Sequence, residues 1–452
     1  MQDSPLSLLP PIIAIIIAIW RKNALLALFS GMVLCFLMIA NWQPIEGIIN
    51  SGHGLLNVFS SLGNIYIVTF SLLIGALVAL MNQSGAVNGF ILLLAKLKLV
   101  KNSRQAAILP TVVGTSIFTD TNLSMFTAGM ASQKLFDQHK LSRARLAYLI
   151  DSTCAPVSIL FLINGWGAYV LGLLDGYSFD DPVGILIGTV GYNFYAIIAV
   201  AMAYYTAYSG KVFGPMKNAN SVINTDNTHH VEHQSPAVIM WLPLLSLLLI
   251  TLTLLWFTGD GDMRRGSGSY SVFWAIVSAL VILIIMIKSY KLMSFNEIFK
   301  HSLKGIKHMA PAVAILVLSF AFGDAIKSLG TGVYVSQLLN VEVPLYFLAP
   351  ILFLAAAFMA FATGTSWGTF AILVPIAVPI AQQTGLPVEF LVAAVLGGGI
   401  FGDHASPISD TTVVASIASG CDHFEHVKTQ LPYALVGGGL TLIIYIFIGL
   451  SF

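Results

Sequence analysis

The stretch GDHASPISDTT, at residues 402–412, is the most informative segment of the chain. It places two carboxylates, Asp403 and Asp410, on either side of Pro407 in an otherwise apolar region. Proline removes an amide donor and disfavours helix just before it, so carbonyl oxygens are left free at this point. A carboxylate at membrane depth is costly unless it is paired, protonated or bound to a cation. We therefore expect this helix break to bind a hard cation such as Na⁺, or a proton.

The regions around this stretch are apolar from one end of the chain to the other. Of 452 residues, 57% are hydrophobic and 9% are charged, whereas a soluble domain has about 25% charged residues. Many of the apolar runs approach the roughly 20 residues that a helix needs to cross a bilayer. Spans are expected near residues 7–20, 23–41, 64–82, 105–130, 146–173, 183–208, 236–257, 271–288, 309–330, 346–384, 388–415 and 431–450. The composition thus predicts an all-α polytopic protein of the lipid bilayer and excludes a soluble protein.

The two halves of the chain repeat each other. The triplet GTS occurs at residues 114–116 and again at 364–366, and the run SPIS at 406–409 has a counterpart in APVS at 155–158. Matches in register at offsets of about 250 residues favour a duplication. We predict a first inverted repeat at residues 1–208, a cytoplasmic linker at 209–235 and a second inverted repeat at 236–452.

The placement of basic residues predicts the orientation. We assume an N-terminus outside and five crossings plus one same-side hairpin in each half. The cytoplasmic loops then hold 18 of the 21 lysines and arginines. An odd number of crossings inverts the second half relative to the first, which is typical of secondary transporters. We expect a multi-pass protein of the bacterial inner membrane. The amphipathic segment 293–309 is expected to lie flat in the cytoplasmic interface.

Three further motifs interrupt the apolar spans with short polar side chains: GTSIFTDTN at 114–122, DSTCAP at 151–156 and GTSWGT at 364–369. Helix breaks at membrane depth are tolerated where they line a cavity or are buried by protein, so the first and third motifs predict the tips of re-entrant hairpins. Close packing of helices through small residues is the alternative for these two motifs. It does not account for Asp120 or for the matched positions in the two halves.

The expected ligands are the hydroxyl, amide, carboxyl and imidazole side chains of these motifs. The ion- or substrate-binding residues that we predict are Thr115, Ser116, Asp120, Asn122, Asp151, Thr153, Thr365, Ser366, Thr369, Asp403, His404, Ser406, Ser409 and Asp410. The Na⁺ candidates among them are Asp120, Asp151, Asp403 and Asp410. His404 has two interpretations, a proton-linked group or a structural partner of the neighbouring carboxylate. Asp324 and Lys327 share a helix face, and they are interpreted as a structural or gating pair, with a ligand-binding role as the alternative.

The motif at 364–369, the run VPI at 374–376 and the stretch at 402–412 together resemble the signature of the NhaC-type sodium/proton antiporter family. The resemblance is specific across residues 340–430 and thinner in the first half. It implies a fold of inverted repeats, each with five helices and a hairpin. It also implies an elevator mechanism in which residues 105–173 and 346–420 move, and often a homodimer.

The leading hypothesis is exchange of Na⁺ for H⁺ by an alternating-access mechanism. The alternative is Na⁺- or H⁺-coupled transport of a small organic solute such as an amino acid or a carboxylate, with Trp166, Tyr169 and Trp367 lining its pocket. A passive channel remains a further possibility, and an enzyme is not expected because the zinc-protease spacing His-Glu-x-x-His is missing.

Other partners find little support in the sequence. No basic block interleaved with aromatic residues suggests nucleic acid. The three cysteines, Cys35, Cys154 and Cys421, show neither disulfide nor metal-ligand spacing. We expect no cofactor apart from the coupling ions Na⁺ and H⁺.

Overall fold

The computed structural model describes residues 5–21, 23–96, 100–177, 179–219, 235–331, 334 and 344–452, and every regular element among them is a helix. In the first half these are η1 (Pro5–Leu8), α1 (Leu9–Arg21), α2 (Ala24–Ile39), α3 (Pro44–Asn57), η2 (Val58–Ser60), α4 (Leu62–Gln83), α5 (Ala86–Lys96), α6 (Ser103–Ser116), α7 (Thr121–Gln138), α8 (Arg143–Leu160), α9 (Gly165–Asp175), α10 (Pro182–Tyr192), α11 (Phe194–Ser209) and η3 (Gly214–Asn218). In the second half they are α12 (Val238–Thr258), η4 (Met263–Arg265), α13 (Gly268–Ser289), α14 (Phe295–Leu329), η5 (Leu345–Phe347), α16 (Leu348–Thr363), α17 (Ser366–Thr384), α18 (Val388–Ala405), α19 (Asp410–Ser419) and α20 (His423–Gly449).

The helices meet the requirement for crossing a bilayer. Eight of those described are long and apolar enough to span it, or nine if α10 and α11, bent by 49° at their break, count as one span. Many begin at a side chain that accepts a hydrogen bond from the first turn and so satisfies a free amide. These capping residues include Asn23, Ser61, Asn102, Asp120, Ser142, Asn164, Asp181, Asn193, Ser294, Ser409 and Asp422.

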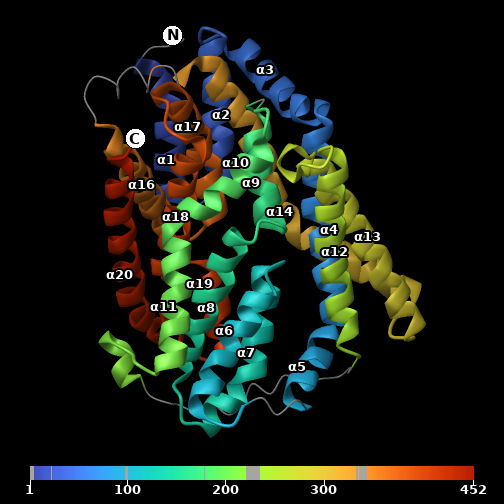
Figure 1. The fold of residues 1–452 in the computed structure, drawn as a ribbon. Helices are drawn as coiled ribbons and strands as arrows, with labels where there is room; N and C mark the ends of the chain where they lie inside the picture. The colour runs from blue at the N-terminus through green and yellow to red at the C-terminus, as the bar shows by residue number, and fades with distance from the viewer. Residues whose placement is uncertain are drawn as a thin grey trace.

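The helices separate into two groups (Figure 1). The long helices α4, α12, α13 and α14 pack on one another along one side of the molecule. The broken and paired helices α6 to α9 and α16 to α19 form most of the remaining body, together with α11 and α20. The motifs at 114–122, 151–156, 364–369 and 402–412 lie in this second group, whereas Asp324 and Lys327 lie on α14 of the first.

The expected interruptions are present. The span expected at 105–130 is a helical hairpin, α6 and α7, broken at residues 117–120. The helix across 146–173 is divided into α8 and α9, and that across 388–415 into α18 and α19. The segment 346–384 breaks at Gly364, which has the left-handed φ of 71° that favours glycine. The inverted relation between the two halves stays a prediction.

One expectation about a segment is wrong. Residues 293–309 do not form a separate interfacial helix, because α14 runs without interruption through 35 residues from a capping box at Ser294. Apolar helices stand at the first two expected spans, Pro5–Arg21 and Ala24–Ile39, and they are shorter than the eight candidate membrane spans. Most of the expected linker, residues 220–234, lies outside the described residues.

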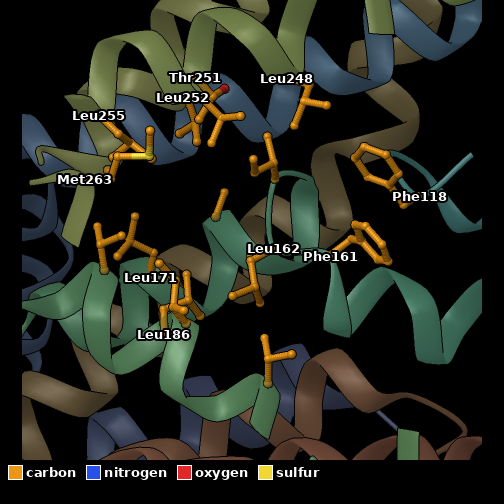
Figure 2. A pocket seen from close by; sticks show the side chains of 18 of the residues that line it. Phe118, Phe161, Leu162, Leu171, Leu186, Leu248, Thr251, Leu252, Leu255 and Met263 are labelled. Atoms are coloured by element: carbon orange, nitrogen blue, oxygen red, sulfur yellow. The ribbon is translucent and has the colours of Figure 1, made fainter. Parts of the chain in front are cut away.

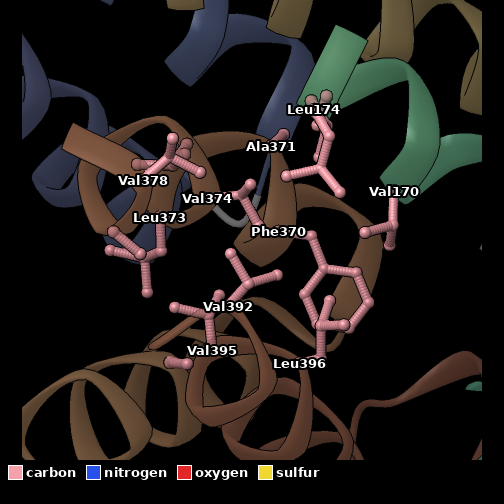
Figure 3. Packing of buried hydrophobic residues seen from close by; sticks show 14 of the residues in the cluster. Val170, Leu174, Phe370, Ala371, Leu373, Val374, Val378, Val392, Val395 and Leu396 are labelled. Atoms are coloured by element: carbon pink, nitrogen blue, oxygen red, sulfur yellow. The ribbon is translucent and has the colours of Figure 1, made fainter. Parts of the chain in front are cut away.

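The core beneath the site is packed from branched side chains of α9, α17 and α18 (Figure 3). Val170 and Leu174 of α9 lie toward Phe370 of α17, and Val392 and Leu396 of α18 close the cluster from below. Each of these five side chains is at most 1% exposed. Such close packing gives α17 and α18 a fixed relative position, which the polar groups at their ends depend on.

Glycines in α18 serve this packing. A Cβ at Gly398 would clash with the carbonyl oxygen of Phe353 in α16, and one at Gly402 with that of Ala357. The glycine run therefore lets α18 lie directly against the backbone of α16. The helix α18 is regular from Val388 to Ala405 despite this run.

A second close crossing joins α4 to α14. A Cβ on Gly75 would clash with the carbonyl oxygen of Gly305, and a Cβ on Gly305 with that of Gly75. The two backbones are in direct contact because neither helix carries a side chain there. Small residues at such crossings allow the close packing that associates helices in membranes.

This crossing yields a test of stability. Gly75→Ala or Gly305→Ala forces the helices apart, and overpacking of this kind costs about 1–3 kcal/mol. We expect the melting temperature of the detergent-purified protein, followed by fluorescence size-exclusion, to fall by several degrees. The matched control is Gly52→Ala, because no atom lies within 4 Å of a Cβ at that position. Equal melting temperatures for all three variants would contradict the close backbone contact between α4 and α14.

Candidate functional site

The break between α18 and α19 is closed by contacts with its own flanks and with the break at Gly364. Ser406 Oγ donates to the carbonyl oxygen of Phe361, 2.8 Å away on α16. The carbonyl of Ile408 lies against Gly364, where a Cβ would approach to 2.5 Å. His423 Nε2 is 2.7 Å from the carbonyl oxygen of Pro407 and donates to it, since a carbonyl only accepts. The two interruptions of the second half therefore meet at one point.

Asp403 lies in the last turn of α18, shortly before this break, and is fully buried. Ser409 Oγ donates to Asp403 Oδ1 at 2.6 Å and Thr411 Oγ1 donates to Oδ2 at 2.9 Å. Each carboxyl oxygen thus has one hydroxyl partner from the start of α19. Asp410 is exposed and accepts the backbone amide of Thr411 at 2.9 Å. The result is a buried and an exposed carboxyl group at opposite ends of one four-residue break.

Asp151 of α8 is the second fully buried carboxyl group. Gln430 Nε2 donates to Asp151 Oδ2 at 2.6 Å, and His426 Nε2 lies 3.3 Å from the same oxygen. His404 Nε2 is 3.8 Å from Oδ1, which receives no hydrogen bond. Both α20 residues were missed by the sequence analysis, which began the last span at residue 431 although the helix begins at His423. The available signal was polar residues four apart, at 426 and 430, just before an apolar run.

His404 joins three helices. Its Nε2 lies 3.2 Å from the carbonyl oxygen of Asp151, so that nitrogen carries the proton. Its Nδ1 lies 3.1 Å from the hydroxyl of Tyr195 on α11, which donates to it in the neutral ring. Gln430 Nε2 also donates to the backbone oxygen of His404 at 3.0 Å. His404 is therefore bonded at both nitrogens and ties α18 to α8 and α11.

The first hairpin carries the remaining motif residues of its half. Asp120 caps α7 by accepting the amide of Leu123 at 2.7 Å. Thr115 Oγ1 lies 2.9 Å from the hydroxyl of Tyr204. Ser116 and Thr153 donate to the carbonyl oxygens of their own helices, and Asn122 is exposed.

Asn164 holds the first hairpin against the break between α8 and α9. Its Nδ2 donates to the carbonyl oxygens of Phe118, Ser158 and Phe161 at 2.7–2.8 Å, and its Oδ1 accepts the amides of Trp166 and Gly167. The side chain is fully buried. One side-chain amide thus contacts five backbone groups of the hairpin tip and the α8–α9 break, with its two N–H hydrogens shared among three carbonyl oxygens. The sequence analysis did not select it, because Asn164 stands outside the repeated motifs.

The motif at 364–369 starts α17. Thr365 is half-buried at the N-cap, Ser366 is buried, and Thr369 donates to the carbonyl oxygen of Thr365 at 3.0 Å. The ring of Trp367 lies 4.7 Å from that of Tyr169 and 5.2 Å from that of Trp166. The three aromatic side chains expected to line a pocket therefore pack on one another.

The four predicted Na⁺ candidates lie in two places, three of them near the breaks of α8 and α18–α19 and Asp120 at the tip of the first hairpin. His404, which follows Asp403 in the chain, lies 3.8 Å from Asp151 Oδ1, and Asp410 stands on the other side of the break that follows His404. Among the described residues no hydrogen bond or ion pair joins Asp120 to any of these three. The binding roles of all fourteen residues stay predictions, but the geometry concentrates three of the four carboxylates around the breaks of α8 and α18–α19.

Cavities of two kinds adjoin these breaks. The larger, of about 280 Å³, is apolar and lies between the break of α8 and α9, the tip residue Phe118 and the helices α10, α12 and α13 (Figure 2). Thr251 is the one polar side chain labelled in its wall. The smaller cavity, of about 10 Å³, is lined by Tyr148, Ser152, Tyr195, His404 and Gln430, among others. About one water molecule fits such a space.

Comparison with known proteins places the chain among membrane transporters. The model of the Na⁺/H⁺ antiporter family matches residues 146–450. An uncharacterized protein of Haemophilus influenzae is 32% identical over all of this chain and 92% of its own length. The arginine/ornithine antiporter ArcD of Halobacterium salinarum is 37% identical over 24% of this chain and 23% of its own. The YdaH transporter of Alcanivorax borkumensis has a similar fold, with a TM-score of 0.65, 14% identity and coverage of 95% of this chain and 99% of that one.

Asn164 provides the test of this arrangement. Asn164→Ala removes the donor to three carbonyl oxygens and the cap of α9, and each buried group left without a partner costs about 1–3 kcal/mol. We expect a larger fall in melting temperature than for the control Asn102→Ala, which removes a single exposed cap on α6 worth about 1 kcal/mol. If both variants melted at the same temperature, Asn164 would not hold the hairpin in place.

Proposed function

Because the chain belongs to the Na⁺/H⁺ antiporter family and is a secondary transporter rather than an enzyme, we propose that it exchanges Na⁺ for H⁺ across the membrane. The observation that carries this proposal is the pair Asp403 and Asp410 at the break between α18 and α19, inside the matched region. Buried acidic residues in membrane proteins mark ion pathways and proton relays.

The chemistry at this break suits alternating occupation by the two ions. The hydroxyls of Ser409 and Thr411 donate to Asp403 and keep lone pairs free, so they supply oxygen ligands beside the carboxylate. Asp410 is exposed and offers an entry point for a cation. A bound Na⁺ would neutralise the buried carboxylate, and a proton would do the same when Na⁺ leaves.

An elevator movement fits the packing. Gln133 of α7 donates to the carbonyl oxygen of Ala418, and Arg143 donates to that of Ser419, so the first hairpin is held to α19. We propose that residues 105–173 and 346–420 move together against α4, α12, α13 and α14. The apolar cavity between the α8–α9 break and α12 supports this division, since its walls make few polar contacts that would resist sliding (Figure 2). Homodimer formation, the inner membrane and an external N-terminus stay predictions.

Transport by the purified protein in proteoliposomes tests the exchange. A jump in external Na⁺, with a trapped pH dye and no organic solute, should move protons in the wild type. Asp403→Asn should reduce the rate at least about tenfold, because removing one partner from a buried charged site costs more than about 1.4 kcal/mol. Asp410→Asn should also reduce the rate, because the exposed carboxylate no longer attracts a cation to the break.

The control for these variants is Asp180→Asn, since Asp180 is an exposed carboxylate in the loop before α10. It should leave the proton flux unchanged. A normal Na⁺-driven proton flux in both Asp403→Asn and Asp410→Asn would show that the break between α18 and α19 does not bind the exchanged ions.

A second candidate function, coupled transport of a small zwitterion such as an amino acid, is favoured by a separate cleft. This cleft, of about 40 Å³, lies between α14, α9, α17 and the start of α4, and Asp324 and Lys327 line it with Tyr177 and Ser319. Lys327 Nζ donates to the carbonyl oxygen of Gly176 at 3.3 Å, and the ion pairs among described residues do not join it to Asp324. Lys327 Nζ also lies 5.6 Å from the centroid of the Tyr177 ring. A carboxylate and an ammonium group therefore line one cleft, and an amino acid offers the two opposite charges to them. The arginine/ornithine antiporter among the relatives supports this class of solute.

The cleft also connects to the ion site. Ser319 Oγ lies 3.4 Å from the hydroxyl of Tyr169, which donates to the carbonyl oxygen of Trp367 at 3.0 Å. Trp367 lies at the start of α17, next to the break that contacts Ile408. A solute bound between α14 and α17 would therefore contact α17, whose first residues follow the Gly364 break that closes the proposed Na⁺ site.

Uptake of labelled amino acids into proteoliposomes tests this second function. Under a Na⁺ or H⁺ gradient, Asp324→Asn and Lys327→Gln should each lower solute uptake about tenfold while Na⁺-driven proton movement without solute persists, since each charge contacts one end of the zwitterion. The control Glu46→Gln neutralises an exposed carboxylate on α3. If neither cleft variant changed amino-acid uptake, the cleft would be excluded as the solute-binding site.

A further inference from the structure

The apolar cavity between α12 and the break of α8 and α9 has a volume of about 280 Å³. An engineered apolar cavity of roughly 150 Å³ in another protein stays dry and binds benzene, so this one has room for a larger apolar guest. Thr251 is the one polar side chain among the described residues that line it. Its hydroxyl donates to the carbonyl oxygen of Leu247 at 2.8 Å and is therefore already bonded. We propose that this cavity binds one acyl chain of a membrane phospholipid.

Two glycines keep the space open. A Cβ at Gly167 would clash with the carbonyl oxygen of Leu162, and a Cβ at Gly268 would clash with the side chain of Leu171. The chain therefore packs closely at the start of α9 and at the start of α13, and neither position carries a side chain that could fill the cavity. The α12 residues that line it are spaced three or four apart and so share one helix face: Leu248, Thr251, Leu252 and Leu255.

The cavity is elongated, as an acyl chain requires. Met263 and Leu255 lie at one end of it, and Phe118 and Phe161 lie at the other (Figure 2). The rings of Phe118 and Phe161 stack with their centroids 5.1 Å apart and bound that end. The lining residues of α12 alone, from 248 to 255, extend over about 10 Å at 1.5 Å per residue. A compact solute would leave part of this space empty, whereas a single hydrocarbon chain would fill it lengthwise.

The opening of the cavity is apolar and lies at membrane depth. Three of the side chains that line it are also exposed: Phe161 by 48%, Ile187 by 49% and Met263 by 37%. Phe161 lies in a candidate membrane span, and Ile187 lies in the bent pair α10 and α11. The core of a bilayer contains hydrocarbon and no water. The molecules that can enter this opening are therefore lipid chains.

The end of the cavity near Met263 provides a positive charge for the lipid headgroup. The short helix η4 packs against α10 and α12. Met263 and Gly268 both line the cavity, and Arg265 lies between them in the chain and is exposed. A guanidinium group binds phosphate oxygens through two parallel hydrogen bonds. A phospholipid with its chain in the cavity would thus place its phosphate at Arg265.

The bound chain would lie between the two groups of helices. Phe118 belongs to the first hairpin, within the residues 105–173 that we propose to move, whereas the opposite side of the cavity is formed by α12 and α13. The chain would contact both groups, so it would have to slide or leave when they move. This consequence rests on the proposed elevator movement, but the binding of the chain does not.

Photolabelling in lipid nanodiscs tests the site without relying on transport. The probe is phosphatidylglycerol with a diazirine at the end of one acyl chain, diluted into phosphatidylcholine. After illumination, the adducts are mapped by mass spectrometry. In the wild type we expect adducts at Phe118 and at residues 160–163, because the end of the chain would lie against the two stacked rings.

Two substitutions obstruct the cavity from different sides. Leu252→Trp fills it from α12, and Ile187→Trp covers its opening from α10. Each should lower the adducts at Phe118 and 160–163 at least about fivefold, because a ring in a closely packed space excludes the chain. The control Leu249→Trp adds the same ring to α12 at a side chain that is 53% exposed and outside the cavity. It should leave these adducts unchanged.

The headgroup contact has its own variant. Arg265→Gln should lower labelling by the phosphatidylglycerol probe about fivefold, the effect typical of one basic residue at a lipid surface. The matched control is Asp260→Asn, which removes an exposed acidic group from the same loop and should not weaken labelling. Equal labelling of Arg265→Gln and the wild type would refute the phosphate contact.

The remaining outcomes decide the chain site and separate it from the proposed function. Absence of wild-type adducts at Phe118 and 160–163 would overturn the site. Adducts that persist in both Leu252→Trp and Ile187→Trp would also overturn it, because the probe would then react from the surrounding bilayer. If Leu252→Trp failed to fold, the half-exposed position of Ile187→Trp would still allow the comparison. Obstructable labelling in a protein without Na⁺-driven proton movement would support the lipid site and refute the proposed exchange.

Discussion

The burial of carboxyl groups among apolar helices is the constraint on which the rest of this structure depends. A buried carboxylate requires donors or a counter-ion, and an unbroken helix uses its own backbone groups and offers few. Asp403 obtains its donors because α18 stops and α19 starts with hydroxyl side chains. Asp151 lies inside α8 and obtains its donor from a neighbouring helix, through Gln430. The helix breaks and the approach of α20 are two solutions to the same requirement.

The broken helices and hairpins support one another across the two halves. The first hairpin is bonded to the end of α19 through Gln133, and the start of α17 is bonded to α9 through Tyr169. Each half thus supplies a broken helix against which the other half packs. Such reciprocal contacts are what a duplicated and inverted ancestor would produce. They also mean that displacement of one hairpin displaces the opposite helix break.

The sequence predicted the positions of the breaks well and the contacts around them less well. Residues such as Pro407 and Gly364 act locally, through a missing amide or a left-handed backbone, so their effect is visible in the sequence. His426 acts through a fold that brings the start of α20 to α8, and no local pattern predicts that distance. The same holds for the ring of Trp367, which packs against Tyr169 from the other half. The amphipathic segment before Met309 was wrongly predicted to be a separate interfacial helix. A local amphipathic pattern does not show whether the helix continues into the next apolar segment, as α14 does.

The length of α14 has a consequence for the lipid around the protein. Its 35 residues extend for about 52 Å at 1.5 Å per residue, whereas the hydrocarbon core is roughly 30 Å thick. The helix must therefore tilt, or its lysine-bearing first part must leave the core and run past the headgroups. Because Gly305 fixes this helix to α4 without an intervening side chain, a change in tilt is passed to α4. A change in bilayer thickness would therefore change the tilt of α14 and α4 together.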